Sequence, residues 1–223
     1  MIFTIIFGVL SVFVQYAIWV YAPVEASLGI VQKIFYLHLP FAWWGMFSFF
    51  VLFIASILFL KTNKDKFDAL ARACAEVGVL FTGLALICGS IWAKASWGVW
   101  WLWEPRLTTT FIMWFVYAGY LLIQTLNIDS GKKKRISAVI GIVAFLNVPL
   151  VFVSARMWRS VHPVVFASKH GGLPPEMFYT IIISLVGFGF LWISLLILRF
   201  RQLFIFNKLE QRLMELQGAY YER

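Results

Sequence analysis

Long apolar stretches recur along the sequence with little chain between them, and this pattern limits the possible folds more than any other feature. A helix needs roughly 20 mostly apolar residues to cross about 30 Å of hydrocarbon. Such stretches lie at about residues 2–22, 39–60, 76–92, 107–126, 136–155 and 177–198. Of the 223 residues, 62% are hydrophobic and 13% charged, which leaves no room for a sizeable soluble domain. The sequence therefore predicts an all-α, polytopic membrane helix bundle of six transmembrane helices, forming one domain over residues 1–223.

The placement of the basic residues predicts how the bundle is oriented. Thirteen of the nineteen Lys and Arg residues lie in the loops 61–75 and 127–135 and in the tail 199–223. Short loops rich in Lys and Arg remain in the cytoplasm. Both termini are then cytoplasmic, and the outward-facing loops are 23–38, 93–106 and 156–176. The net charge of +9 thus reflects topology, and no nucleic-acid partner is expected.

The two ends of the chain give further expectations. The first apolar run is long and has no basic residues before it, so it is expected to be a retained span rather than a cleaved signal peptide. In the tail, Phe206, Leu209 and Leu213 alternate with charged residues at helical spacing. This spacing predicts a short amphipathic helix, which we expect to lie on the membrane surface.

The second outward loop is unusually rich in tryptophan. Five of the eleven tryptophans fall within twelve residues: Trp92, Trp97, Trp100, Trp101 and Trp103. If this loop is helical, Trp97, Trp100, Trp101 and Glu104 form one flat aromatic face with an acid at its edge. Such a face suits a planar, π-rich ligand, whereas the simpler interpretation is an aromatic belt at the membrane interface.

All three histidines lie on the outward side. His38 opens the second span, while His162 and His170 belong to the third outward loop. Two neutral imidazoles can fill both axial positions of a haem iron. His38 and His162 are the better pair because each is close to the end of a span, whereas His170 precedes two glycines. The alternative for each is an ordinary hydrogen-bonded residue at the interface.

Arginines also lie near the outward ends of the fourth and fifth spans, where the positive-inside rule disfavours them. Arg106, Arg156 and Arg159 could bind the two propionates of haem through bidentate hydrogen bonds. Contact with lipid phosphates, or pairing with Glu104 or Glu176, explains them about as well.

The segment from Trp97 to Thr108, WGVWWLWEPRLT, carries a family resemblance. It resembles the W-G-x-x-W-x-W-D-x-R-L-T signature of the Trp-rich (WWD-type) haem-handling proteins of cytochrome c maturation. Within that group, the six spans and the outward histidines look most like cytochrome c maturation protein C, also called haem exporter protein C. The resemblance extends from about Ile34 to about Leu198. One departure is that Glu104 stands where the signature has Asp.

The resemblance implies a site and a role. The implied axial ligands of the iron are His38 and His162, and the implied platform for a non-covalent, transient haem b consists of Trp97, Trp100, Trp101 and Trp103. Arg106 falls on the arginine of the signature and Glu104 on its acid, whereas Arg159 is added from its chemistry alone.

Location and partners also follow from the resemblance. The site would face the periplasm from a bacterial inner membrane. The haem would pass to a periplasmic haem chaperone, cytochrome c maturation protein E. The other expected partners are ATP-binding-cassette subunits of the maturation system and membrane lipid.

Two alternatives of other classes stay open. A subunit of a cytochrome c haem lyase would be an enzyme, but such relatives are usually longer and carry more histidines. A small-molecule transporter would show broken spans with polar groups at mid-membrane, for which Asn147-Val148-Pro149 is the one candidate. Since the sequence has no P-loop and no HExxH motif, we expect a haem-transfer protein rather than an enzyme.

Overall fold

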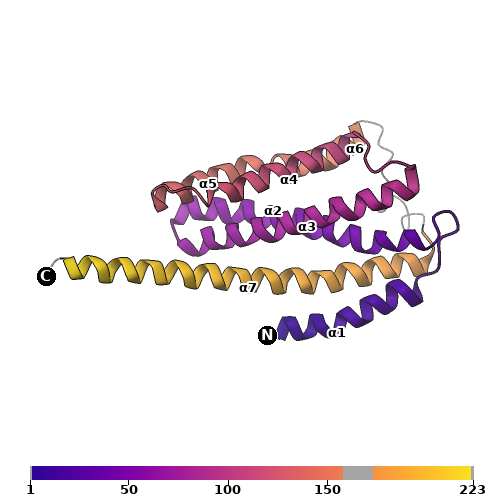
Figure 1. Cartoon of the computed structure of the whole chain (residues 1–223), viewed down its shortest axis with the longest axis horizontal. Helices are drawn as coiled ribbons and strands as arrows, with labels where there is room; N and C mark the ends of the chain where they lie inside the picture. The colour runs from indigo at the N-terminus through magenta and orange to yellow at the C-terminus, as the bar shows by residue number, and fades with distance from the viewer. Residues whose placement is uncertain (1, 158–172, 222–223) are drawn as a thin grey trace.

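The computed structural model describes residues 2–157 and 173–221, and within them the chain is built from helices joined by short loops (Figure 1). The α-helices are α1 (Ile2–Tyr16), α2 (Phe35–Thr62), α3 (Asp65–Trp97), α4 (Pro105–Ile123), α5 (Ser130–Ala144), α6 (Asn147–Met157) and α7 (Pro175–Tyr221). A π-helical segment, η1 (Ala17–Tyr21), extends α1, and a 3₁₀ turn, η2 (Ile30–Ile34), precedes α2. Five helical segments are long and apolar enough to span a membrane, with a shorter apolar helix over Gly8–Tyr21. The predicted all-α membrane bundle is confirmed.

Helices α2 and α3 form the centre of the bundle and pack closely because small residues lie between them. A Cβ atom added at Gly78 would come within 2.5 Å of the Phe49 ring, so the two backbones can approach only because Gly78 has no side chain. Phe49 in turn stacks on Tyr117 of α4, with ring centroids 3.6 Å apart. This stack joins α4 to the central pair.

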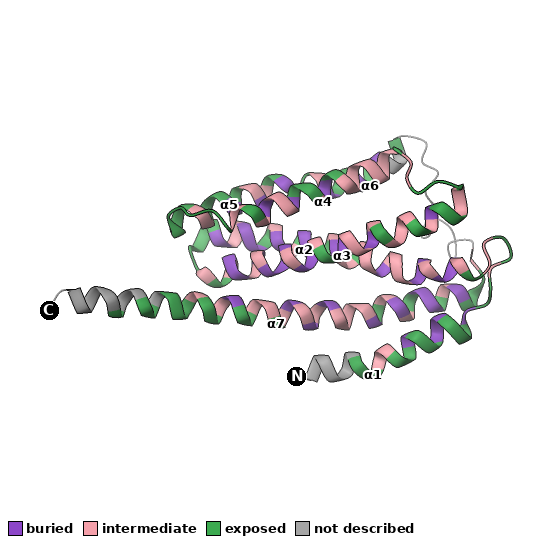
Figure 2. Ribbon diagram, viewed as in Figure 1, coloured by how far each residue is buried: buried purple, intermediate pink, exposed green. Residues whose placement is uncertain are grey.

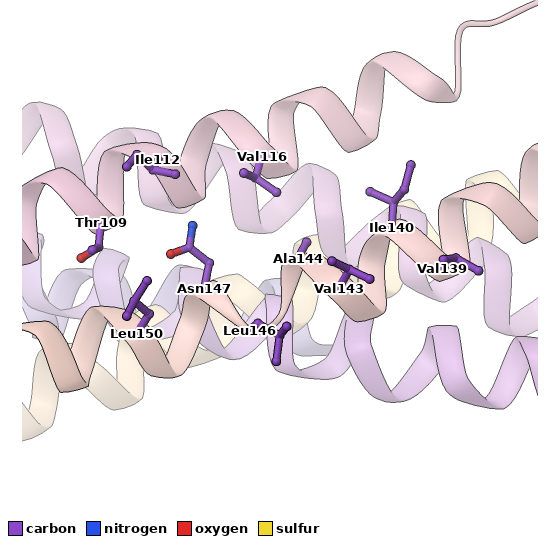
Figure 3. Close-up of a pocket in the computed structure, with 10 residues that line it drawn as sticks. All are labelled: Thr109, Ile112, Val116, Val139, Ile140, Val143, Ala144, Leu146, Asn147 and Leu150. Carbon is purple, nitrogen blue, oxygen red and sulfur yellow. The ribbon is translucent and has the colours of Figure 1, made fainter.

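The fifth predicted span is broken into two helices. α5 ends at Ala144 and α6 begins at Asn147, with a turn between them. Pro149 lies in the first turn of α6, where its missing N–H breaks no intrahelical hydrogen bond. A groove of about 490 Å³ lies beside this break, between α4 and the α5–α6 pair. Figure 3 shows Thr109 and Asn147 as its polar side chains among aliphatic ones.

The last helix is longer than predicted. α7 runs unbroken for 47 residues, about 70 Å at 1.5 Å per residue, and extends past its neighbours (Figure 1). The tail is helical, as predicted, but it continues α7 and does not form a short helix of its own. No Gly or Pro lies between Gly189 and Gly218, so nothing in the sequence ends the helix. Beyond the bundle, apolar side chains such as Leu209 and Leu213 are exposed (Figure 2).

Specific polar contacts hold α7 to the central pair. Trp192 stacks on Trp44 of α2 with centroids 5.0 Å apart, and its indole N–H donates to the Ser48 hydroxyl over 2.7 Å. At the opposite end from the Trp loop, Glu76 of α3 pairs with both Arg72 and Arg199. We call the end of the bundle that carries Glu76, Arg72 and Arg199 the basic end. The opposite end, which carries the Trp-rich residues 98–104, is the Trp-loop end.

Candidate functional site

The Trp loop, residues 98–104, is irregular and lies between two well-defined helix ends. Gly98 ends α3 in a left-handed conformation with φ of 76°, a common way for a helix to stop. Glu104 and Pro105 then start α4. The predicted helix that would align Trp97, Trp100 and Glu104 on one face is therefore absent. Its place is taken by a loop because a left-handed residue at one side and a proline at the other exclude a continuous helix.

Two tryptophans of the signature are used for packing. Trp97 is the last residue of α3 and meets Trp92 edge to face, with centroids 5.7 Å apart. Trp101 turns towards α4 and packs against Phe111, with ring centroids 5.4 Å apart. Its indole nitrogen is buried and has no hydrogen-bond acceptor among the described residues. These side chains anchor the loop to the two helices that it joins.

The other two tryptophans of the loop are open to the surroundings. Trp100 is 58% exposed and Trp103 is 74% exposed. Trp103 also meets the edge of Trp101, with ring centroids 5.7 Å apart, so its orientation is partly held. Both indoles are accessible to an apolar ligand at this end of the bundle. The predicted platform thus divides into supporting and exposed tryptophans.

Glu104 has a structural task in this conformation. One of its carboxylate oxygens accepts a hydrogen bond of 3.1 Å from the backbone N–H of Leu107, which caps the first turn of α4. Aspartate, the acid of the family signature, is among the residues preferred at such a capping position. Arg106 follows in the first turn of the same helix, so both charged residues of the signature lie at one helix end.

His38 lies in the first turn of α2 at the Trp-loop end, and its ring is part-buried against α3. Its Nδ1 atom is 2.8 Å from the backbone oxygen of Ala85. Because a carbonyl oxygen only accepts hydrogen bonds, Nδ1 carries the proton in the neutral ring, and the lone pair resides on Nε2. Metal-binding histidines commonly have one ring nitrogen held by a carbonyl in this way.

One turn of α3 connects His38 to the Trp loop. Ser90, five residues after Ala85, donates its hydroxyl to the backbone oxygen of Trp100 over 2.8 Å. Sequence reasoning missed both Ala85 and Ser90. Sequence spacing could not have identified either residue. Ala85 acts through its backbone oxygen, and the partners of the two residues, His38 and Trp100, lie outside α3.

The remaining predicted residues cannot be placed beside His38. His162, Arg159 and His170 lie outside the described residues, and Arg156 lies in α6. Among the residues that the structure describes, no three or more His, Cys, Asp or Glu form a metal-binding cluster. The structure places the oriented imidazole of His38 and the exposed indoles of Trp100 and Trp103 at the same end of the bundle. These groups suit a planar, apolar macrocycle with a metal at its centre.

Comparison with known families supports the same conclusion. The family model described as Heme exporter protein C matches residues 1–215. The chain belongs to the Heme exporter protein C family. Its membership supports a role in haem handling for cytochrome c maturation. The sequence resemblance is thereby confirmed.

Relatives within the Heme exporter protein C family come from several bacteria. The protein of this name from Bradyrhizobium diazoefficiens is 31% identical over 176 residues, covering 78% of this chain and 67% of the relative. That from Haemophilus influenzae is 30% identical over 183 residues, or 81% and 74% of the two chains. That from Escherichia coli K12 is 28% identical over 185 residues, or 83% and 75%. The similarity is thus spread over most of the chain.

Proposed function

We propose that this protein binds haem b at the Trp-loop end and delivers it to a periplasmic haem chaperone, cytochrome c maturation protein E. His38 and His162 are the axial ligands, and the tryptophans of the signature form the platform. Arg106 and Arg159 bind the propionates, with Glu104 holding the start of α4. The role is transfer rather than catalysis, and the protein works beside ATP-binding-cassette subunits.

The observation that carries this proposal is the environment of His38. The ring is held at Nδ1 by Ala85, so Nε2 keeps the lone pair that an iron needs. The exposed indoles of Trp100 and Trp103 lie at the same end. The haem is cargo here, and its iron accepts two imidazole nitrogens while its porphyrin ring supplies the apolar surface that indoles cover.

The orientation in the membrane follows from charge. The Trp-loop end faces the periplasm, because the loops at the basic end hold most of the Lys and Arg residues. Both termini then lie in the cytoplasm. Single cysteines placed at Ser27 and at Lys132 test this: a membrane-impermeant thiol reagent should label the first in intact spheroplasts and the second only after lysis. The native cysteines, Cys74 and Cys88, would be replaced by serine first.

Haem ligation is tested by absorption spectra of protein purified in detergent from haem-replete cells. The wild type should show a low-spin, six-coordinate spectrum, and His38→Ala and His162→Ala should each lose it. His170→Ala is the matched control and should keep the wild-type spectrum. A wild type without haem, or spectra unchanged in both variants, contradicts the site. Loss of the low-spin spectrum in His38→Ala and His170→Ala, but not in His162→Ala, would assign the second ligand to His170.

Delivery is tested separately. Haem-loaded protein is mixed with the purified apo-chaperone, and the haem that each protein holds is followed after separation. Haem should move to the chaperone, and it should not attach covalently to a C-x-x-C-H peptide offered instead. Covalent attachment to the peptide would identify the protein as part of a haem lyase.

A small-molecule transporter is the second candidate, and the broken span favours it. Asn147 begins α6 beside the groove, and its side-chain oxygen has no hydrogen-bond partner among the described residues. Polar groups at breaks in membrane helices often mark transport sites. Under the leading proposal, Asn147→Leu keeps the haem spectrum and haem delivery. Loss of delivery with haem still bound would favour a transport path beside α6.

A further inference from the structure

A glycine of α3 lies directly against the His38 ring. A Cβ atom added at Gly89 would lie 2.9 Å from Cε1 of His38 and 3.1 Å from Nδ1. Real Cβ atoms hardly ever approach other atoms so closely, so the ring or the helix would have to move. The imidazole therefore occupies space that any residue larger than glycine would take.

The second contact of the ring comes from the same face of the same helix. Ala85 precedes Gly89 by four residues, which places the two about one turn apart on one side of α3. The Ala85 oxygen holds Nδ1, while Gly89 leaves room for the ring edge. A ring pushed away from residue 89 cannot keep both the 2.8 Å hydrogen bond and its direction. The orientation of Nε2 thus depends on the absence of a side chain at Gly89.

We infer that Gly89 is a positioning residue for haem binding: it lets the Ala85 carbonyl orient His38 so that Nε2 points to the iron. This rests on the proposed function, since it assigns His38 as a ligand. Because Gly89 has no side chain, its effect passes through the imidazole that it contacts. A larger residue at this position would force the ring or the helix to move.

The test is Gly89→Ala, purified in detergent and titrated with haem. The affinity should fall about tenfold or more, as for other residues that orient a metal-binding histidine. The low-spin spectrum should become partly high-spin, as in His38→Ala. Added free imidazole should restore the low-spin spectrum in both variants, because it replaces the misplaced ring. Loss of haem that imidazole does not restore would indicate a general disturbance of the fold and would contradict the inference.

Two matched controls separate this effect from general disturbance. Gly45→Ala crowds the same α2–α3 interface, since its Cβ would meet Cγ2 of Thr82 at 2.6 Å, but it does not touch His38. Gly119→Ala adds the same methyl group where no atom lies within 4 Å. Both should keep the wild-type spectrum. If Gly45→Ala gives the same high-spin spectrum, helix separation is the cause and the inference is wrong.

A double variant covers the case in which Gly89→Ala folds poorly. In His38→Ala the ring is gone, so a methyl group at residue 89 has no imidazole to displace. Adding Gly89→Ala to His38→Ala should therefore change the thermal stability and haem affinity little. Equal losses in both backgrounds would overturn the inference. Loss of haem by His38→Ala with a wild-type spectrum in Gly89→Ala would refute only the role of Gly89, whereas an unchanged His38→Ala would refute the proposed site.

Discussion

The hydroxyl of Ser90 donates a 2.8 Å hydrogen bond to the backbone oxygen of Trp100. This contact ties the middle of the Trp loop to α3, one residue after Gly89, which packs against His38. His38 and the Trp loop are thus held by neighbouring positions of one helix. A displacement of this turn would affect both parts of the site.

Removing the Ser90 hydroxyl should loosen the Trp loop while leaving the bundle intact. Ser90→Ala loses one hydrogen bond, worth about 1 kcal/mol, and should weaken haem binding roughly fivefold with little change in thermal stability. Haem titration measures the affinity. Ser96→Ala is the control, because within the part of the chain that the structure describes its hydroxyl bonds only to the oxygen of Trp92 in its own helix. Equal effects of the two serines would argue against a specific tie.

Truncation of the exposed indoles should reduce haem binding without destabilising the fold. Trp100→Ala and Trp103→Ala should each weaken haem affinity by about 1 kcal/mol or more, since each loses an aromatic contact with the ligand. Their melting temperatures should stay near that of the wild type because both side chains are largely exposed. The control is Phe115→Ala, which removes an exposed aromatic side chain of α4 outside the Trp loop. It should change neither the haem affinity nor the melting temperature. Unaltered haem affinity in both tryptophan variants would remove these residues from the platform.

Glu104, the acid of the signature, should be replaceable by aspartate. Glu104→Asp should keep the cap at the start of α4, whereas Glu104→Ala should lower the free energy of unfolding by about 1 kcal/mol. Thermal unfolding of the two variants in the same detergent measures the difference. If Glu104→Asp is as unstable as Glu104→Ala, the cap is not the main role of this carboxylate.

The acid at the basic end should stabilise the attachment of α7. Glu76 accepts from Arg199 of α7, including a 3.1 Å bond from Nη2, and from Arg72 over 3.2 Å. These groups are partly exposed, so Glu76→Gln should cost only about 1 kcal/mol of unfolding free energy. Thermal unfolding at low and high salt checks this, with a smaller difference at high salt. Glu210→Gln, on the exposed part of α7, should have no measurable effect.

Much of the architecture could be predicted from local sequence. The apolar stretches predict membrane helices because hydropathy acts residue by residue and needs no knowledge of neighbours in space. The breaks were harder to predict. Pro149 indicated a disturbed fifth span, and Gly98 ends α3 before the loop. The length of α7 was missed because charged residues after Arg199 end a membrane span but do not end a helix.

The candidate site shows the same division. Residue types alone identified the Trp-rich loop and His38 at one end of the bundle, since both features are local in the chain. Which indoles support the loop and which are exposed was decided by packing against Trp92 and Phe111. The protonated nitrogen of His38 was decided by Ala85, 47 residues away. These properties depend on contacts between distant segments, so they exist only once α2, α3 and α4 have packed together.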